Sequence, residues 1–158
     1  KRAENPKGNV WSPPDWQVKH PGEVPATVQS GVGDWEPMWD MRTLSSRDPG
    51  RSEQGQVWMR EIRPLVEGLP LTPFVRAASA ADWSNPGANW GSNGLEFINA
   101  DITLYLHRYP RDEWIGFETS SHHSADGIAV GQCTMYDEEG AIGSSTVCAI
   151  AQRRRVGG

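Results

Sequence analysis

Four strand-like runs in the second half of the chain constrain its fold more than any other feature. Each is rich in aliphatic, β-branched and aromatic residues, and they cover residues 95–108, 114–120, 128–137 and 141–152. The connections between them are short and contain Pro, Gly, Ser and Asp, which favour turns. Because parallel neighbours need a crossover of about a dozen residues, runs joined this closely are antiparallel. The pattern predicts an antiparallel meander.

The segment 70–86 has the 3.6-residue period of an amphipathic helix. Its apolar stripe consists of Leu71, Phe74, Val75 and Ala78. Thr72 and Pro73 favour a helix start, and Asn85, which precedes a proline, favours its end. Asp82 returns to the apolar stripe at about 100° of rotation per residue. The spacing therefore predicts an acidic side chain that points toward the core.

The residues before the helix predict an arm and two further strands. Five prolines in 1–33 exclude a regular helix or a central strand, so we expect an extended arm or inter-domain linker there and a folded domain over 34–158. Apolar stretches at 35–41 and 57–62, separated by a polar loop at 45–56, predict two strands. Together these elements describe an α+β fold, a curved antiparallel sheet wrapped around one long helix. That architecture is the hot dog fold.

The composition argues against several classes of protein. The formal net charge of −5 and the pI near 5.3 argue against nucleic-acid binding, which typically uses a strongly basic domain. No run approaches the roughly 18 apolar residues of a membrane span, and no apolar leader opens the sequence. Two cysteines are too few for a disulfide scaffold. We therefore expect a cytoplasmic protein that does not bind a membrane and needs no cofactor.

The cysteines and histidines predict neither a disulfide nor a metal site. The tight turn between the last two strands places Cys133 opposite about Ser144, so Cys148 lies about 13 Å away, beyond disulfide reach. His122 and His123 fall in an expected loop, and no Cys or carboxylate follows at a ligand spacing. We interpret the histidine pair as an exposed part of that loop.

Several short segments, in their order and spacing, resemble the type-II acyl-CoA thioesterase family. They are Ala80-Ala81-Asp82, Asn99-Ala100-Asp101, Leu106-His107-Arg108, Asp112-Glu113-Trp114 and the stretch 139–147, followed by an Arg-rich end. Members of that family carry two hot dog domains in one chain, and the resemblance is to the second domain, over about 35–155. The proline-rich arm resembles the connector from a first domain. The resemblance implies a homo-oligomer or pairing with a separate first hot dog chain.

The resemblance also implies a catalytic arrangement. In the family, an Asp near the helix end, a Thr on the next strand and a Gln on the last strand hold the water that attacks the thioester. Asp82 matches the Asp and is implied to be the general base, Asn99 falls at the Thr position and Cys148 falls at the Gln position. An amide can still bind water, whereas a thiol is a weak donor and acceptor.

Each of these residues also has a structural interpretation. Asp82 could cap the turn after the helix, Asn99 could be satisfied by backbone groups of the sheet, and Cys148 could fill a small buried space. Cys148 as a covalent nucleophile would need a His or a cationic neighbour to lower its thiol pKa, and the sequence places none beside it.

The substrate and the function follow from the same resemblance. Coenzyme A carries several phosphates, and Arg108, Arg153 and Arg154 are candidates to bind them, with a solvated basic tail as the alternative for the last two. The first interpretation is a hydrolase in which water attacks a thioester carbonyl of an acyl-CoA or an acyl-carrier protein. The second is a non-catalytic hot dog domain that binds an acyl chain or forms the structural half of a double hot dog assembly. Cys148 favours the second.

Overall fold

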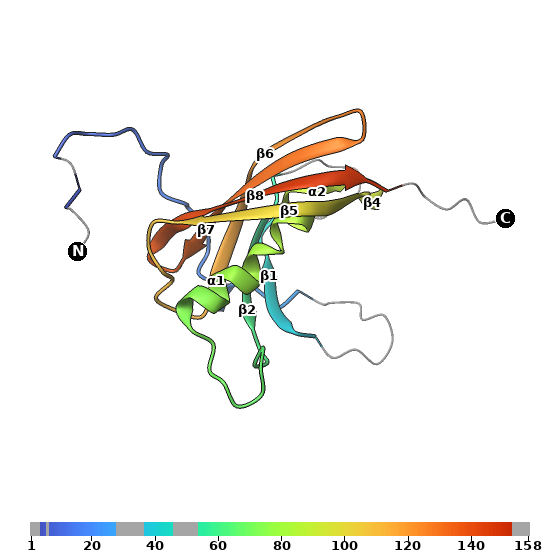
Figure 1. The fold of residues 1–158 in the computed structure, drawn as a ribbon. Coiled ribbons are helices and arrows are strands. Elements are labelled where there is room, and N and C mark those ends of the chain that lie inside the picture. The colour runs from blue at the N-terminus through green and yellow to red at the C-terminus, as the bar shows by residue number, and fades with distance from the viewer. Residues whose placement is uncertain (1–3, 6, 28–36, 46–53, 153–158) are drawn as a thin grey trace.

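A six-stranded antiparallel sheet curves around two consecutive helices (Figure 1). This computed structural model describes residues 4–5, 7–27, 37–45 and 54–152. The sheet order is β1-β2-β6-β7-β8-β5, with strands β1 (Trp39–Thr43), β2 (Gln56–Glu61), β5 (Phe97–Leu106), β6 (Ile115–Ala125), β7 (Ile128–Asp137) and β8 (Gly140–Ala151). The remaining elements are η1 (Pro21–Glu23), α1 (Pro73–Ala81), α2 (Ser84–Asn89), β3 (Trp90–Gly91) and β4 (Gly94–Leu95). The predicted α+β architecture, a curved antiparallel sheet around a central helical segment, is confirmed.

The strand order differs from a simple meander at one place. β6, β7 and β8 pair in succession as predicted, but β5 pairs with β8, and β2 takes the place beside β6. The predicted pairing of the runs 95–108 and 114–120 is therefore wrong. β5 forms one edge of the sheet, and the chain then crosses back to β6. Local patterning cannot distinguish the two orders, because both give antiparallel strands with the same buried faces.

β6 is longer than the sequence pattern indicates. It extends to Ala125, and only Asp126 and Gly127 form the turn to β7, with positive φ angles of 51° and 79°. Two positive φ values in an Asp-Gly pair are typical of a type I′ hairpin turn, whose twist matches that of the flanking strands. The expected loop at 121–127 is therefore mostly strand. His122 and His123 belong to β6 and not to a loop.

The predicted helix is divided in two. It begins as expected, because the Thr72 side chain accepts a backbone N–H of the first turn at 3.3 Å and Pro73 occupies the first helical position. Asn85 does not end it, since α2 continues through Pro86. Proline has no N–H to donate to the carbonyl four residues earlier, which here belongs to Asp82. The break falls where that hydrogen bond is missing, and it leaves Asp82 as the C-cap of α1.

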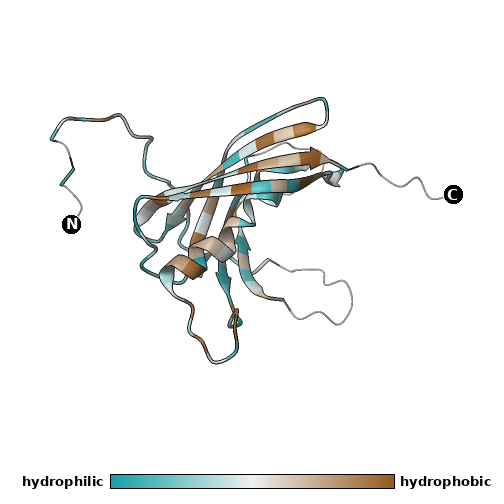
Figure 2. Cartoon of the chain, in the orientation of Figure 1, coloured by the Kyte–Doolittle hydropathy of each residue, from teal (hydrophilic) through white to brown (hydrophobic). Residues whose placement is uncertain are grey.

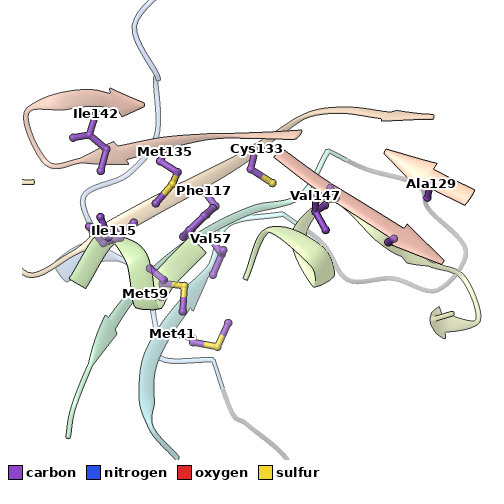
Figure 3. Close-up of a cluster of buried hydrophobic side chains, with 14 residues drawn as sticks. Met41, Val57, Met59, Ile115, Phe117, Ala129, Cys133, Met135, Ile142 and Val147 are labelled. Atoms are coloured by element: carbon purple, nitrogen blue, oxygen red, sulfur yellow. The ribbon is translucent and has the colours of Figure 1, made fainter. Parts of the chain in front are cut away.

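Small residues let both helices lie deep in the concave face of the sheet. Ala77, Ala80 and Ala81 of α1 and Ala88 of α2 are buried. Gly131 of β7 faces α2 so closely that a β-carbon added there would lie 2.5 Å from the Ala88 methyl carbon. Around this contact, larger side chains from several strands of the curved sheet form the core (Figure 3). Among them are Val57, Met59, Ile115, Phe117, Met135 and Val147. Hydrophobic residues recur along the long strands between less hydrophobic ones (Figure 2), as expected for strands with one buried face.

The proline-rich arm packs against the outer face of the sheet, opposite the helices. Trp16 stacks on Tyr136 with ring centroids 4.3 Å apart, and its ring lies 4.9 Å from that of Trp58. Beneath it is Gly116, where an added β-carbon would come within 2.4 Å of the Trp16 ring. The Trp58 indole N–H donates to the Lys19 carbonyl at 3.1 Å. Stacking and this hydrogen bond hold the arm in its extended path.

Both cysteines are free, which confirms the expectation that they form no bridge. Cys133 pairs with Ser145 and not with Ser144, because a bulge between Met135 and Tyr136 shifts the register of β7 and β8 by one residue. Cys133 is fully buried, and burial raises the pKa of its thiol to about 12. A thiol with so high a pKa is unreactive near neutral pH.

A buried ion pair joins the end of β5, the connection from β5 to β6 and the turn between β7 and β8. The Asp137 carboxylate is fully buried and accepts two bonds from the Arg108 guanidinium, at 2.5 and 2.7 Å. It also accepts the backbone N–H groups of Arg111 and Glu139, each at 3.0 Å. Burial opposes ionisation, but Arg108 and the two backbone donors outweigh it and hold the pKa of Asp137 below its usual value. One carboxylate therefore fixes three chain segments.

Asp137→Asn tests this ion pair. The substitution leaves Arg108 without its counter-charge, and we expect the free energy of unfolding at pH 7 to fall by about 3 kcal/mol. Because the folded-state pKa of Asp137 is lowered, its stabilisation is present above the ordinary carboxyl pKa and is lost as the pH falls through the folded-state value. The difference between the two proteins should therefore shrink below about pH 4.

Urea denaturation at pH 7 and at pH 3 measures both effects. Glu139→Gln is the matched control, because its carboxylate pairs with Arg111 on the exposed surface and should contribute less than about 1 kcal/mol. An Asp137→Asn variant as stable as the wild type at pH 7 would contradict the role given to this ion pair.

Candidate active site

Two of the side chains implied by the family resemblance meet at the end of α1. Asp82 is the C-cap of that helix, and the Asn99 side-chain amide of β5 donates to its Oδ1 at 3.4 Å. Both side chains are exposed to solvent. The expectation that Asp82 points into the core is therefore wrong, because the helix ends at this residue and its side chain leaves the apolar stripe. The pair is a carboxylate and an amide, side by side, that water can reach.

A β-bulge places Asn99 at this point. In the register of β5 with β8, Asn99 pairs with Ala149 and Asp101 pairs with Cys148, so Ala100 is an extra residue. Before the bulge, Phe97 packs against the core, and Asn99, two residues on, lies on the same face. After the bulge, Ile102 packs against the core. Strict alternation would group Asn99 with Asp101 on the face away from the core, and the bulge corrects that grouping.

Cys148 lies on the other face of the sheet from this pair. Its neighbours Val147 and Ala149 are fully buried in the core under the helices, and successive strand residues point to opposite sides. Cys148 therefore faces outward, paired with Asp101 and Val130. The residue of β8 opposite Asn99 is Ala149, which offers only a methyl group. The structure brings together Asp82 and Asn99 of the three residues, and not Cys148.

The three arginines assigned to phosphate binding differ in how far the structure describes them. Arg108 is already bound on both guanidinium nitrogens to Asp137, and it also donates to the Gly140 carbonyl at 3.0 Å. The proximity of Asp137 raises the pKa of Arg108 further, so the pair stays ionised. This geometry favours a structural role for Arg108. Arg153 and Arg154 lie outside the described residues.

A chain of polar side chains beside the Asp82–Asn99 pair was not expected from the sequence. Asn85 donates to the Phe97 carbonyl at 3.1 Å, and Asn89 donates to Asn85 Oδ1 at 2.8 Å. His122 Nδ1 lies 2.8 Å from Asn89 Oδ1, and its Nε2 lies 3.2 Å from Ser124 Oγ. The four-residue spacing of the asparagines on a helix is a signal in the sequence. His122 gives no comparable signal in the sequence when its segment is interpreted as a loop.

A shallow cleft opens at the opposite end of β5. It is lined by Phe74, Leu104, Leu106, His107, Arg108 and Tyr109. Phe74 and Tyr109 meet edge to face there, with centroids 6.2 Å apart. Its lining combines two leucines and two aromatic rings with His107 and Arg108, a composition that suits a hydrocarbon chain with a polar end.

No three His, Cys, Asp or Glu side chains among the described residues gather closely enough to hold a metal ion. No helix in the described part of the chain is long and apolar enough to cross a membrane.

Solved structures share this fold. Acyl-CoA thioesterase II TesB2 from Mycobacterium marinum aligns with a TM-score of 0.64 and 20% identity, over 97% of this chain and 60% of that chain. A hot dog fold protein of unknown function from Alicyclobacillus acidocaldarius aligns with a TM-score of 0.67 and 15% identity, over 96% of this chain and 59% of that one. The tesB protein of Mycobacterium avium subs paratuberculosis aligns with a TM-score of 0.59 and 16% identity, over 87% of this chain and 56% of that one.

These similarities establish the hot dog fold, and the chain spans about three-fifths of the length of each of these solved chains. No curated protein sequence is detectably similar to it. The sequence itself matches one family across the arm, the helices and most of the sheet: residues 12–147 match the acyl-CoA thioesterase C-terminal domain. This match agrees with the resemblance carried by the short segments around Asp82 and Asn99, and the chain belongs to the acyl-CoA thioesterase C-terminal domain family.

Proposed function

We propose that this chain hydrolyses acyl thioesters, with an acyl-CoA as substrate, through a water molecule held by both Asp82 and Asn99. The observation that carries the proposal is the bulge in β5, which brings the Asn99 amide to 3.4 Å from the Asp82 carboxylate at a solvent-exposed helix end. In a strand without the bulge, Asn99 would lie on the opposite face of the sheet from Asp82. Membership of the acyl-CoA thioesterase C-terminal domain family supports an acyl-CoA as the substrate class.

The chemistry of this proposal uses both side chains. Asp82 accepts a proton from the water as its oxygen attacks the thioester carbonyl carbon. Asn99 donates to one carboxylate oxygen of Asp82, which orients the carboxylate, and its own Oδ1 is free in this scheme to accept a hydrogen bond from the same water. The tetrahedral intermediate then expels the thiolate, which takes up the proton that Asp82 received from the water. Backbone N–H groups are the expected donors to the developing oxyanion.

The nucleotide end of coenzyme A would need cationic partners. Arg153 and Arg154 follow β8 in the sequence after one intervening residue, Gln152, and we keep them as the proposed phosphate contacts. Arg108 is less suited to that role, because any phosphate would compete with the buried carboxylate of Asp137. Substrates carried on an acyl-carrier protein share the same thioester and the same site.

A second candidate function is acyl-chain binding without hydrolysis. Ala149 supplies no polar group beside Asn99, so the attacking water has one side-chain contact fewer than the family arrangement implies. The cleft around Leu104 and Leu106 could hold an acyl chain without any chemistry. Hydrolysis of an acyl-CoA by the purified chain separates the two functions.

We also propose that this hot dog domain works in association with a second one, either another copy of the chain or a separate first-half chain. In the described part of the chain β5 forms an edge of the sheet, and an edge strand is a common place for pairing with another chain. Ile98, Ile150 and Ile128 pair in a row across β5, β8 and β7, and they are 49%, 56% and 55% exposed. A contiguous aliphatic row on a sheet face is a common feature of protein interfaces.

Asp82→Asn should abolish thioesterase activity and preserve the fold. The substitution removes the proposed base and keeps the shape of the side chain, so we expect turnover to fall by at least about 10²-fold. Steady-state hydrolysis of acyl-CoAs of several chain lengths measures the loss. Asp101→Asn is the matched control, because it removes an exposed carboxylate two residues beyond Asn99 and on the other side of the bulge. Turnover within a few-fold of wild type in Asp82→Asn would move the site elsewhere.

Cys148→Gln tests the arrangement of β8. If Cys148 stood beside the attacking water, the Gln side chain would supply the missing contact and raise turnover. Because Cys148 faces away from Asp82 and Asn99, we expect turnover to stay within about twofold of wild type. A tenfold gain confined to the chemical step would place Cys148 at the site and contradict the register.

Association is tested in solution. Light scattering of the purified chain at micromolar concentration should give at least twice the 17.5 kDa of one chain, or 17.5 kDa with a poorly cooperative thermal transition. Ile150→Glu, in the centre of the aliphatic row, should weaken any self-association. A monomer with a sharp, concentration-independent melt would exclude the proposal.

A further inference from the structure

The chain of hydrogen bonds from Phe97 to Ser124 has a fixed direction. A backbone carbonyl only accepts, so Asn85 turns its NH₂ group toward Phe97 and its Oδ1 the other way. Asn89 must then donate to Asn85 and turn its own Oδ1 toward His122. Both amides are buried, at 4% and 5% exposure, where an unsatisfied polar group is costly. Neither amide can reverse without losing buried hydrogen bonds.

This direction fixes the tautomer of His122. Asn89 Oδ1 is an acceptor 2.8 Å from His122 Nδ1, so Nδ1 carries the proton of the neutral ring. Nε2 then presents a lone pair 3.2 Å from Ser124 Oγ, and the hydroxyl donates to it. The Phe97 ring meets the imidazole edge to face at 5.9 Å and supports it from a second side. A hydroxyl, a base and an amide that orients the base stand in line, which is the general arrangement of an activated nucleophile.

Ser124 is also accessible. Ser124 and His122 are both exposed, two residues apart on one face of β6. Within the described residues, β2 pairs with β6 only along Ile115–Glu118, so the last part of β6 has no described strand on that side. A reactant can therefore reach the Ser124 hydroxyl from solvent.

We propose that Ser124, His122 and Asn89 form a covalent acyl-transfer site, in which the Ser124 hydroxyl takes the acyl group of an activated thioester or ester. His122 Nε2 accepts the hydroxyl proton as Oγ attacks the acyl carbonyl carbon. The carbon–sulfur or carbon–oxygen bond of the donor breaks, and His122 returns the proton to the leaving thiolate or alkoxide. Water, deprotonated by the same nitrogen, then cleaves the acyl-serine ester and restores the hydroxyl. Only the choice of a thioester as donor rests on the proposed function; the nucleophile does not.

The experiment is labelling with diisopropyl fluorophosphate, an electrophile that reacts with activated serines irrespective of substrate recognition. The serine oxygen displaces fluoride from phosphorus, and the adduct is located by intact-mass and peptide mass spectrometry. We expect one adduct, on Ser124, and none in Ser124→Ala. His122→Ala should slow labelling of Ser124 by at least about 10²-fold, the contribution of a general base. His122→Gln is the second variant, because it can keep a hydrogen bond to Asn89 and the fold but has no basic nitrogen.

His123→Ala is the matched control. It removes the neighbouring histidine, which lies on the opposite face of β6, and labelling should stay within about twofold of wild type. Asp82→Asn should also label normally, so failure of the water-based thioesterase proposal and failure of this one are told apart. Absence of an adduct on Ser124 would overturn the proposal, and so would equal labelling rates in wild type and in folded His122→Ala or His122→Gln. The hydrogen-bond chain would then be only a structural contact between α2 and β6.

Discussion

The close approach of α2 to β7 is the constraint on which the rest of the structure depends. Gly131 allows it, because any side chain there would collide with the Ala88 methyl carbon. At this distance the helices contribute only small or polar side chains to the buried region, four of them alanines, and the strands of the curved sheet supply the larger core side chains. The curvature brings the start of β5 near the end of β6, although two strands separate them in the sheet. Phe97 and His122 meet across that curve.

Two local irregularities then create the candidate site. The helix breaks at Asp82 because Pro86 cannot donate to its carbonyl, and β5 bulges at Ala100. The break exposes a carboxylate at the helix end, and the bulge turns an amide toward it. Neither would place a polar group there alone: a continuous helix would carry Asp82 along its apolar stripe, and a regular strand would turn Asn99 away. Irregular backbone of this kind commonly marks functional sites.

The region around α2 thus carries two polar arrangements with different chemistry. The Asp82–Asn99 pair is suited to holding a water molecule, and it accords with the family to which the chain belongs. The Asn89–His122–Ser124 chain is suited to activating a hydroxyl. Both depend on α2 and on the first residues of β5, since Asn85 bonds to the carbonyl of Phe97, two residues before Asn99. A substitution that loosens α2 from β7 should therefore disturb both arrangements together.

The sequence by itself determined the features that short-range chemistry controls. Alternating strands, the helix start at Thr72 and Pro73 and the turn before Gly140 all depend on residues a few positions apart, and that turn keeps the two cysteines apart. The Asp126-Gly127 turn was within reach of the same reasoning. Only the tertiary structure decided that β5 pairs with β8, that a bulge falls at Ala100 and that Cys148 faces outward. A one-residue shift in register reverses every side chain beyond it, and register is set by pairing partners about fifty residues away in the chain.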